Sequence, residues 1–192
     1  MKKKLILILA FAFVLGFSYG SVQAASVSLL PSSQDVAPGD SFFLDIVYDF
    51  TDDATYGGGV DITFDDTILN YGNFSFSSAT SAWDITRDPD ISTGLVSGLA
   101  AGTSAGGITG PVTIGTLFFS ADLSVVPIVS TVLELRESLD PAVGGFFSSV
   151  TNTAQDPTMN SATVNVVPIP GSILLLGSGL VGLIGIARRK RS

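Results

Sequence analysis

The stretch SFFLDIVYDF, residues 41–50, places a large apolar side chain at every second position. Five large apolar residues fall on one face of an extended chain: Phe42, Leu44, Ile46, Tyr48 and Phe50. Asp45 and Asp49 fall on the opposite face, because side chains alternate along a strand. One dry and one wet face are typical of an antiparallel sheet that covers a core. The stretch therefore predicts a central strand of an all-β fold.

Similar runs, separated by clusters of Gly, Pro, Asp and Ser, continue to residue 167. We expect nine strands, over residues 26–30, 41–50, 58–64, 68–76, 82–86, 94–100, 112–121, 130–137 and 162–167. In the third, Val60, Ile62 and Phe64 should face the core, with Asp61 and Thr63 in solvent. Residues 98–111 are too glycine-rich for helix or strand and predict a long mobile loop. The pattern predicts an antiparallel β-sandwich of jelly-roll or immunoglobulin type.

Three stretches carry a resemblance to a known family. They are VSLLPSSQDVAPGDSFFLDIVYDF (27–50), YGGGVDITFDDTILNY (56–71) and VTIGTLFFSADLS (112–124). A first strand, a Pro-Gly-Asp turn, a long second strand, a hairpin and a late strand in this order resemble a cohesin domain. The resemblance implies a cohesin-like sandwich related to carbohydrate-binding modules. It does not imply a dockerin partner, because the partner-binding surface of cohesins cannot be matched to this sequence residue by residue.

The N-terminus has the organisation of a secretory signal peptide. Three lysines precede an apolar run from Leu5 to Phe17, and a segment of small residues follows. Val22 and Ala24 fit the small positions before a cleavage site, so we expect cleavage between Ala24 and Ala25. The alternative is a permanent N-terminal anchor. The domains expected are a signal peptide (1–24), the sandwich (25–167) and a C-terminal tail (168–192).

The tail combines an apolar segment with a basic end. Residues 166–187 carry no charge, and a membrane-spanning helix is expected over 172–187, just after Pro170. Four bases follow, and they should act as a stop-transfer signal on the cytoplasmic side: Arg188, Arg189, Lys190 and Arg191. The alternative is a buried core helix, which would have no use for four terminal bases. This order predicts an exported body held transiently at the membrane.

The tail also resembles the PEP-CTERM sorting signal of Gram-negative bacteria. A proline motif, the apolar segment and the basic end carry the resemblance, and the motif is Val167, Pro168, Ile169 and Pro170. It implies processing by an exosortase-type membrane protease, transient residence in the inner membrane and delivery to the cell surface or the extracellular biofilm matrix. Ile169 replaces the glutamate of the family motif, as in Pro-x-Pro variants of the signal.

Composition excludes several function classes. The chain has no Cys and no His, which removes Ser-His-Asp and Cys-His nucleophiles and an ordinary zinc site. Residues 25–167 hold all 17 acidic residues but only two bases, Arg87 and Arg136. So acidic a body should avoid nucleic acid. Catalysis is not expected either, because a sugar cleft would bring more Lys, Arg, Asn and His around its carboxylates.

Two groups of residues are candidate sites. Two acidic turns could bind calcium through carboxylate and carbonyl oxygens: Asp49, Asp52 and Asp53, then Asp61, Asp65 and Asp66. No EF-hand loop is present and Asp is an ordinary turn residue, so we expect no cofactor, with calcium as the alternative. Trp83 is either a core residue or a sugar-stacking platform. Arg87 should pair with Asp88 or Asp90 in solvent.

Two functions remain. The first is a non-catalytic surface or matrix module that binds polysaccharide or other surface proteins. The second is a carbohydrate-binding module that engages exopolysaccharide through Trp83 or an exposed Tyr. An aromatic patch on an exposed sheet face would favour the second.

Overall fold

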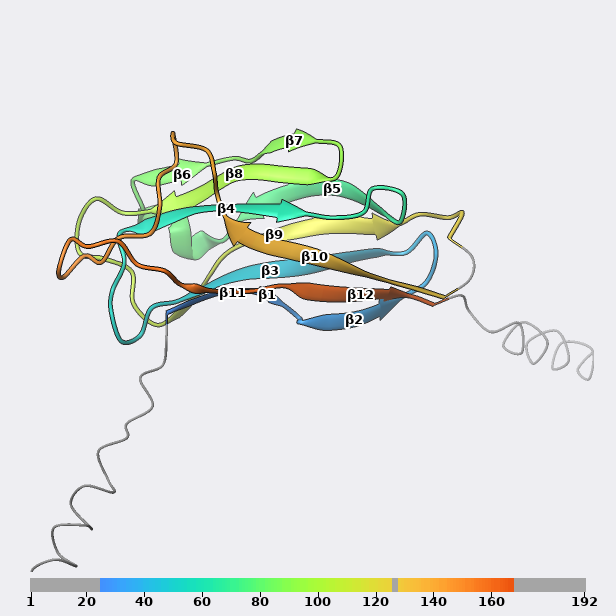
Figure 1. Cartoon of the computed structure of the whole chain (residues 1–192), viewed down its shortest axis with the longest axis horizontal. Helices are drawn as coiled ribbons and strands as arrows, with labels where there is room; N and C mark the ends of the chain where they lie inside the picture. The colour runs from blue at the N-terminus through green and yellow to red at the C-terminus, as the bar shows by residue number, and fades with distance from the viewer. Residues whose placement is uncertain (1–24, 126–127, 168–192) are drawn as a thin grey trace, which may run out of the picture.

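Two β-sheets pack face to face in the computed structural model, which describes residues 25–125 and 128–167 (Figure 1). The five-stranded sheet has the order β11-β1-β3-β9-β5. The second has the order β2-β12-β10-β4-β8-β6, with β7 paired to β8. Along the chain, successive strands often belong to different sheets, as in a sandwich built from hairpins and longer connections. The predicted all-β sandwich is confirmed.

Twelve strands lie within these described residues, rather than the nine expected. They are β1 (Ser26–Leu30), β2 (Ser33–Val36), β3 (Ser41–Asp49), β4 (Gly57–Thr63), β5 (Leu69–Phe76), β6 (Ile85–Arg87), β7 (Asp90–Ser92), β8 (Leu95–Gly102), β9 (Pro111–Ala121), β10 (Val129–Glu137), β11 (Thr158–Asn160) and β12 (Ala162–Val166). The three unexpected strands, β2, β7 and β11, have three or four residues each and lie beside longer strands. Runs this short leave no readable alternation in the sequence.

The core lies between the sheets, and β3 supplies its centre. The four predicted core residues of β3 and Phe50, which directly follows the strand, are buried, from 0 to 7 % exposed. The turn before β3 also forms as expected: the amide of Asp40 donates to the carbonyl of Ala37, and Gly39 has a φ of 85°. Only glycine adopts such a φ without strain, so the Pro-Gly-Asp sequence fixes the entry to β3.

Two expectations were wrong in part. The strand expected over 82–86 begins only at Ile85, because the single-turn 3₁₀ helix η1 (Ser78–Ala82) ends at Trp83. The mobile loop expected over 98–111 is strand up to Gly102. There β8 lies between β4 and β6, and a Cβ on Gly102 would lie 2.5 Å from the carbonyl oxygen of Tyr56. Glycine is thus present for a close approach between strands.

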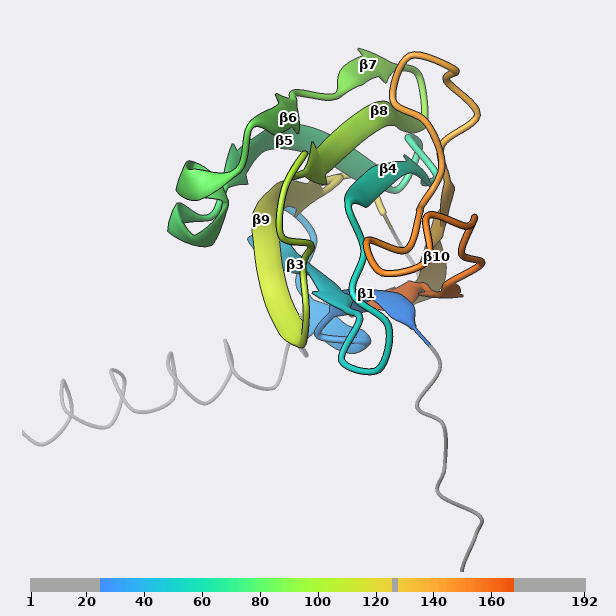
Figure 2. The same ribbon diagram turned by 90° about the vertical axis from the view of Figure 1, so that its left-hand side faces the viewer.

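The segment between β10 and β11 crosses the outer face of the second sheet. Figure 2 shows this orange segment rising along β4 towards β7 before it returns to β11. We call residues 138–147 the crossing segment. At its end Phe146 is fully buried, and its ring stacks on Phe50 with centroids 5.5 Å apart. Phe146 therefore holds the end of the crossing segment in the core of the sandwich.

The chain enters and leaves the sandwich at opposite ends. Ser26, at the start of β1, is paired with Thr158 in the five-stranded sheet. Val166, at the end of β12, is paired with Val129 in the second sheet and lies at the other end of the sandwich (Figure 1). The segments expected to be a signal peptide (1–24), a membrane helix (172–187) and a basic end (188–191) lie outside the described residues. Within the ranges described, no helix is long and apolar enough to cross a membrane.

Candidate functional site

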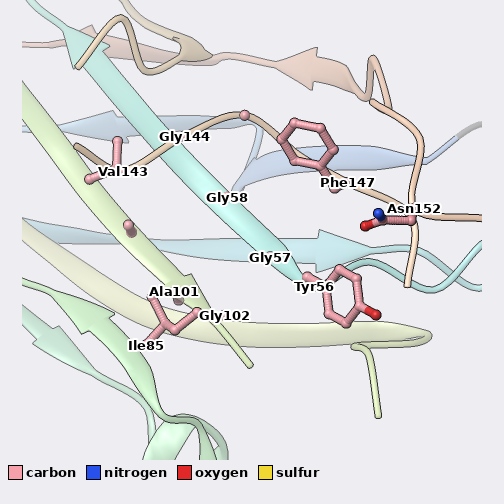
Figure 3. Close-up of a pocket in the computed structure, with 12 residues that line it drawn as sticks. Tyr56, Gly57, Gly58, Ile85, Ala101, Gly102, Val143, Gly144, Phe147 and Asn152 are labelled. Atoms are coloured by element: carbon pink, nitrogen blue, oxygen red, sulfur yellow. The ribbon is translucent and has the colours of Figure 1, made fainter. Parts of the chain in front are cut away.

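A hollow of about 420 Å³ lies over the start of β4. Its lining is mostly apolar or glycine: Tyr56, Gly57, Gly58, Ile85, Ala100, Ala101, Gly102, Val143, Gly144, Gly145, Phe147 and Asn152. Figure 3 shows Gly57 and Gly58 on the floor, with Val143 and Phe147 on one side and Ile85 and Gly102 on the other. A concave apolar surface with few polar groups is the usual form of a binding site.

The glycines of β4 explain why the hollow forms at this place. A Cβ on Gly58 would lie 2.7 Å from the ring of Phe146, which packs from the core side. A Cβ on Gly59 would lie 2.4 Å from Cγ2 of Val143, which packs from the outer side. Because neither glycine has a side chain, the crossing segment can lie directly on the strand. Few side chains project from the sheet next to the crossing segment, and this surface forms the floor of the hollow.

Two large apolar side chains border the hollow from opposite walls. Phe147, in the crossing segment, is 43 % exposed, and Ile85, in β6, is 47 % exposed. Tyr56 is half-buried beside them, and its amide donates to the carbonyl of Phe147 at 2.9 Å. Exposed aromatic and aliphatic residues at the edge of a depression are typical of surfaces that bind another molecule.

An ion pair joins the two walls. Nη1 of Arg87, in β6, lies 2.7 Å from Oδ2 of Asp140, in the crossing segment. Nη2 of Arg87 lies 2.8 Å from Oδ2 of Asp90. The hydrogen bond that Arg87 donates to Asp140 raises the pKa of Arg87, so this guanidinium stays charged. Of the two partners expected as alternatives, Asp90 forms the pair, and Asp140, 53 residues away in sequence, is a second partner.

Asp61 anchors the base of the crossing segment. Its Oδ1 accepts hydrogen bonds from the Ser138 hydroxyl at 2.7 Å and the Gly98 amide at 2.9 Å, and Oδ2 accepts from the Leu139 amide at 3.3 Å. Asp61 is only 4 % exposed, so its predicted position in solvent was wrong. It does point to the outer face of β4, but the crossing segment covers that face.

The other calcium candidates serve as hydrogen-bond acceptors or lie in solvent. Asp49 accepts from the Thr51 hydroxyl at 2.7 Å, and Asp65 from the Thr67 hydroxyl at 2.6 Å, which are turn contacts two residues apart. Asp53 accepts from Ser148 and Gln155. Asp52 and Asp66 are exposed. Among the residues that the structure describes, no three His, Cys, Asp or Glu side chains come together as a metal site.

Hydrogen bonds also set the protonation of several acids. The Ser148 and Gln155 contacts lower the pKa of Asp53, and the Thr67 contacts lower that of Asp65. The Ser104 hydroxyl, followed by its amide, lowers the pKa of Asp84, next to Ile85 at the edge of the hollow. A carboxylate that accepts hydrogen bonds is favoured in its charged form. These aspartates therefore remain anionic at neutral pH.

Trp83 is half-buried and packs against the core. It also borders a second, more polar hollow of about 500 Å³, together with Ser78, Ser81 and Thr86. None of the tyrosines in the described ranges is an exposed platform, since Tyr48 is fully buried and Tyr56 and Tyr71 are half-buried. Two exposed phenylalanines, Phe43 and Phe118, face each other across β3 and β9 instead.

The processing residues fall mostly outside the described ranges. Ala25 is described, and its carbonyl accepts from the Thr158 amide at 2.8 Å. Val167 is also described, and its amide donates to the carbonyl of Val36 at 2.8 Å. Ala24, Pro168, Ile169, Pro170, Arg188, Arg189, Lys190 and Arg191 lie outside.

The fold is similar to that of cohesin domains. The sixth cohesin of scaffoldin B from Acetivibrio cellulolyticus, solved in complex with a Cel5 dockerin, matches with a TM-score of 0.59 and 16% identity, over 75% of this chain and 99% of that one. A non-cellulosomal cohesin from the archaeon Archaeoglobus fulgidus matches with a TM-score of 0.55 and 12% identity, over 78% and 95%.

A type I cohesin from Pseudobacteroides cellulosolvens, the seventh of its ScaB protein, has a TM-score of 0.58 and 12% identity, over 76% of this chain and 94% of that one. No protein-family model matches the sequence, and no curated protein matches it. The body from Ala25 to Val167 is thus a cohesin-like β-sandwich, as its sequence resemblance implied.

The sequence offered two signals for the hollow that were not used. The glycine run in TYGGG (55–59) marks a strand that needs close contacts on both faces. The run VGGFF (143–147) places two phenylalanines after a glycine pair, outside any predicted strand. Neither run indicates that the two segments meet.

Proposed function

We propose that this chain is an exported, non-catalytic binding module whose cohesin-like sandwich binds a protein partner at the hollow over β4. The observation that carries the proposal is the pairing of a small-residue floor with exposed apolar side chains, Phe147 and Ile85, on opposite walls. Exposed apolar groups around a depression are removed from water when a partner binds. The similar fold of cohesins solved in complex with dockerins supports a protein as the partner class.

Delivery to the exterior belongs to the same proposal. A signal peptide over 1–24 would export the body, and the PEP-CTERM-like tail would hold it at the inner membrane until an exosortase-type protease acts near Val167–Pro170. The mature module would then belong to the cell surface or the extracellular matrix of a Gram-negative bacterium.

A photo-crosslinking experiment tests the binding proposal. Benzoylphenylalanine is placed at Ile85 in the full chain, in the cells that export it, and at Phe43 as the control. Phe43 is 54 % exposed on the five-stranded sheet, away from the hollow. We expect a discrete protein adduct at position 85 that Phe147→Ser abolishes, and none at position 43. Equal adducts at both positions, or none at 85, would reject the hollow as the binding site.

A carbohydrate-binding module is the second candidate, and the hydroxyl-rich hollow beside Trp83 favours it. An indole edge next to serine and threonine hydroxyls could support a sugar ring and bind its hydroxyl groups. A glycan array with residues 25–167, with and without calcium, tests this candidate. Binding that Trp83→Ala removes and Phe147→Ser leaves intact would favour it over a protein partner.

A further inference from the structure

The hollow sits in a strongly acidic setting. The only bases of residues 25–167 are Arg87 and Arg136, and both lie against aspartates. The Arg87 guanidinium is shared between Asp90 and Asp140, so that group of three carries a net negative charge. The Arg136 Nε lies 3.8 Å from Asp61. Neither arginine is free to attract an anionic partner to this face.

Carboxylates also border the apolar lining directly. A Cβ on Gly145 would lie 2.5 Å from Oε1 of Glu137, which places that carboxylate against the hollow's wall. Asp84 precedes Ile85 on the opposite wall and accepts a hydrogen bond from the Ser104 amide at 2.7 Å. Acidic residues therefore neighbour lining residues of both walls, Glu137 beside Gly145 and Asp84 beside Ile85.

The floor limits what can enter. Gly57, Gly58, Ala100 and Gly102 project little or nothing into the hollow, and Asn152 is one of its few polar lining residues. A volume of about 420 Å³ is near the lower end for small-molecule sites, and it suits a single large side chain. A charged group placed there would lose hydration on an apolar floor, which is costly without a partner.

From these observations we propose that the hollow receives one large apolar side chain, presented by a basic segment of the partner protein. The apolar side chain supplies burial against Phe147 and Ile85, and the flanking bases complement Glu137, Asp84 and the Arg87 group. Complementary charge raises the association rate and selects among partners more than it adds affinity. The proposal rests on the proposed function, whose site it keeps and whose partner it specifies.

Three synthetic peptides test it by fluorescence anisotropy with the full chain purified in detergent. One carries phenylalanine between lysine pairs, one carries phenylalanine between glutamate pairs, and one carries serine between lysine pairs. We expect the lysine–phenylalanine peptide to bind at least about tenfold more tightly than either other peptide, and more weakly at 0.5 M salt because surface charges are screened. Equal binding of the lysine–serine peptide would overturn the proposal, because charge alone would then suffice.

Matched variants locate the binding. Phe147→Ser and Ile85→Ser should each weaken binding of the lysine–phenylalanine peptide at least about fivefold. Phe43→Ser, which changes a somewhat more exposed phenylalanine on the other sheet, should not. Thermal melts of each variant confirm that the fold is intact. Equal losses in Phe43→Ser would place the peptide elsewhere and refute the inference. Should the peptides fail while the Ile85 crosslink persists, the partner chemistry is wrong and the binding function stands.

Discussion

Replacing Phe146 with alanine should destabilise the sandwich more than any change at its neighbour Phe147. Phe146 is fully buried, with its ring centroid 5.5 Å from that of Phe50 and 5.4 Å from that of Tyr48. A Phe→Ala change at a packed core position costs about 3–5 kcal/mol of unfolding free energy. Phe147→Ala removes a side chain that is 43 % exposed and should cost less than about 1 kcal/mol.

Urea denaturation of residues 25–167, followed by circular dichroism, measures both variants. A natural domain has about 5–15 kcal/mol of stability in total, so the Phe146 variant should lose a large share of it. For a domain of this size the loss corresponds to a fall in Tm of roughly 10–15 °C. A difference below about 1 kcal/mol between the two variants would refute the view that Phe146 fastens the crossing segment to the core.

Four other outcomes are expected. Burial raises the pKa of Tyr48 above its value near 10 in the unfolded chain, so the free energy of unfolding should fall as the pH rises above about 10. In urea melts, Tyr48→Phe should show a smaller fall in stability between pH 9 and 11. Asp61→Ala leaves three donors without their acceptor, of which the Gly98 amide is buried, and should cost about 1–3 kcal/mol in the same assay, whereas retained stability would contradict its anchoring role. Millimolar calcium should raise Tm by less than about 8 °C in a thermal melt, since most candidate aspartates already accept hydrogen bonds within the protein. Changing Pro168 and Pro170 to Ala should block cleavage of the tail, and changing residues 188–191 to Ser should weaken retention of the protein at the membrane. Mass spectrometry that finds LIGIARRKRS on the mature exported protein would rule out sorting by cleavage.

The strands that carry a long alternation were predictable, because a face that packs on a core must repeat every second residue. The five core residues predicted for 41–50 are all buried, and Val60 and Ile62 of β4 are buried as well. Such patterns need no knowledge of distant partners. The cohesin-like fold was predictable for the same reason, since the stretches that carry the resemblance are patterns of strands and turns read locally along the chain.

The cover on the outer face of β4 could not be predicted in this way. Alternation assigns Asp61 to the outer face, which is where it lies, but whether that face is wet depends on Ser138, 77 residues further along the chain. The Arg87–Asp140 pair spans 53 residues and brings together two short segments without periodicity. The hollow is made by these long-range contacts, which no local pattern in the sequence shows.

The placement of the hollow at the far end of the sheet from Val166 has a mechanical consequence. Eight residue steps along β10, from Val129 to Glu137, and three along β4, from Val60 to Gly57, separate the chain's exit from the floor, roughly 35 Å at about 3.3 Å per step. A pull between a bound partner and a chain held beyond Val167 would run along these strands. The interstrand hydrogen bonds, which lie across that direction, would share the load in shear rather than open one after another.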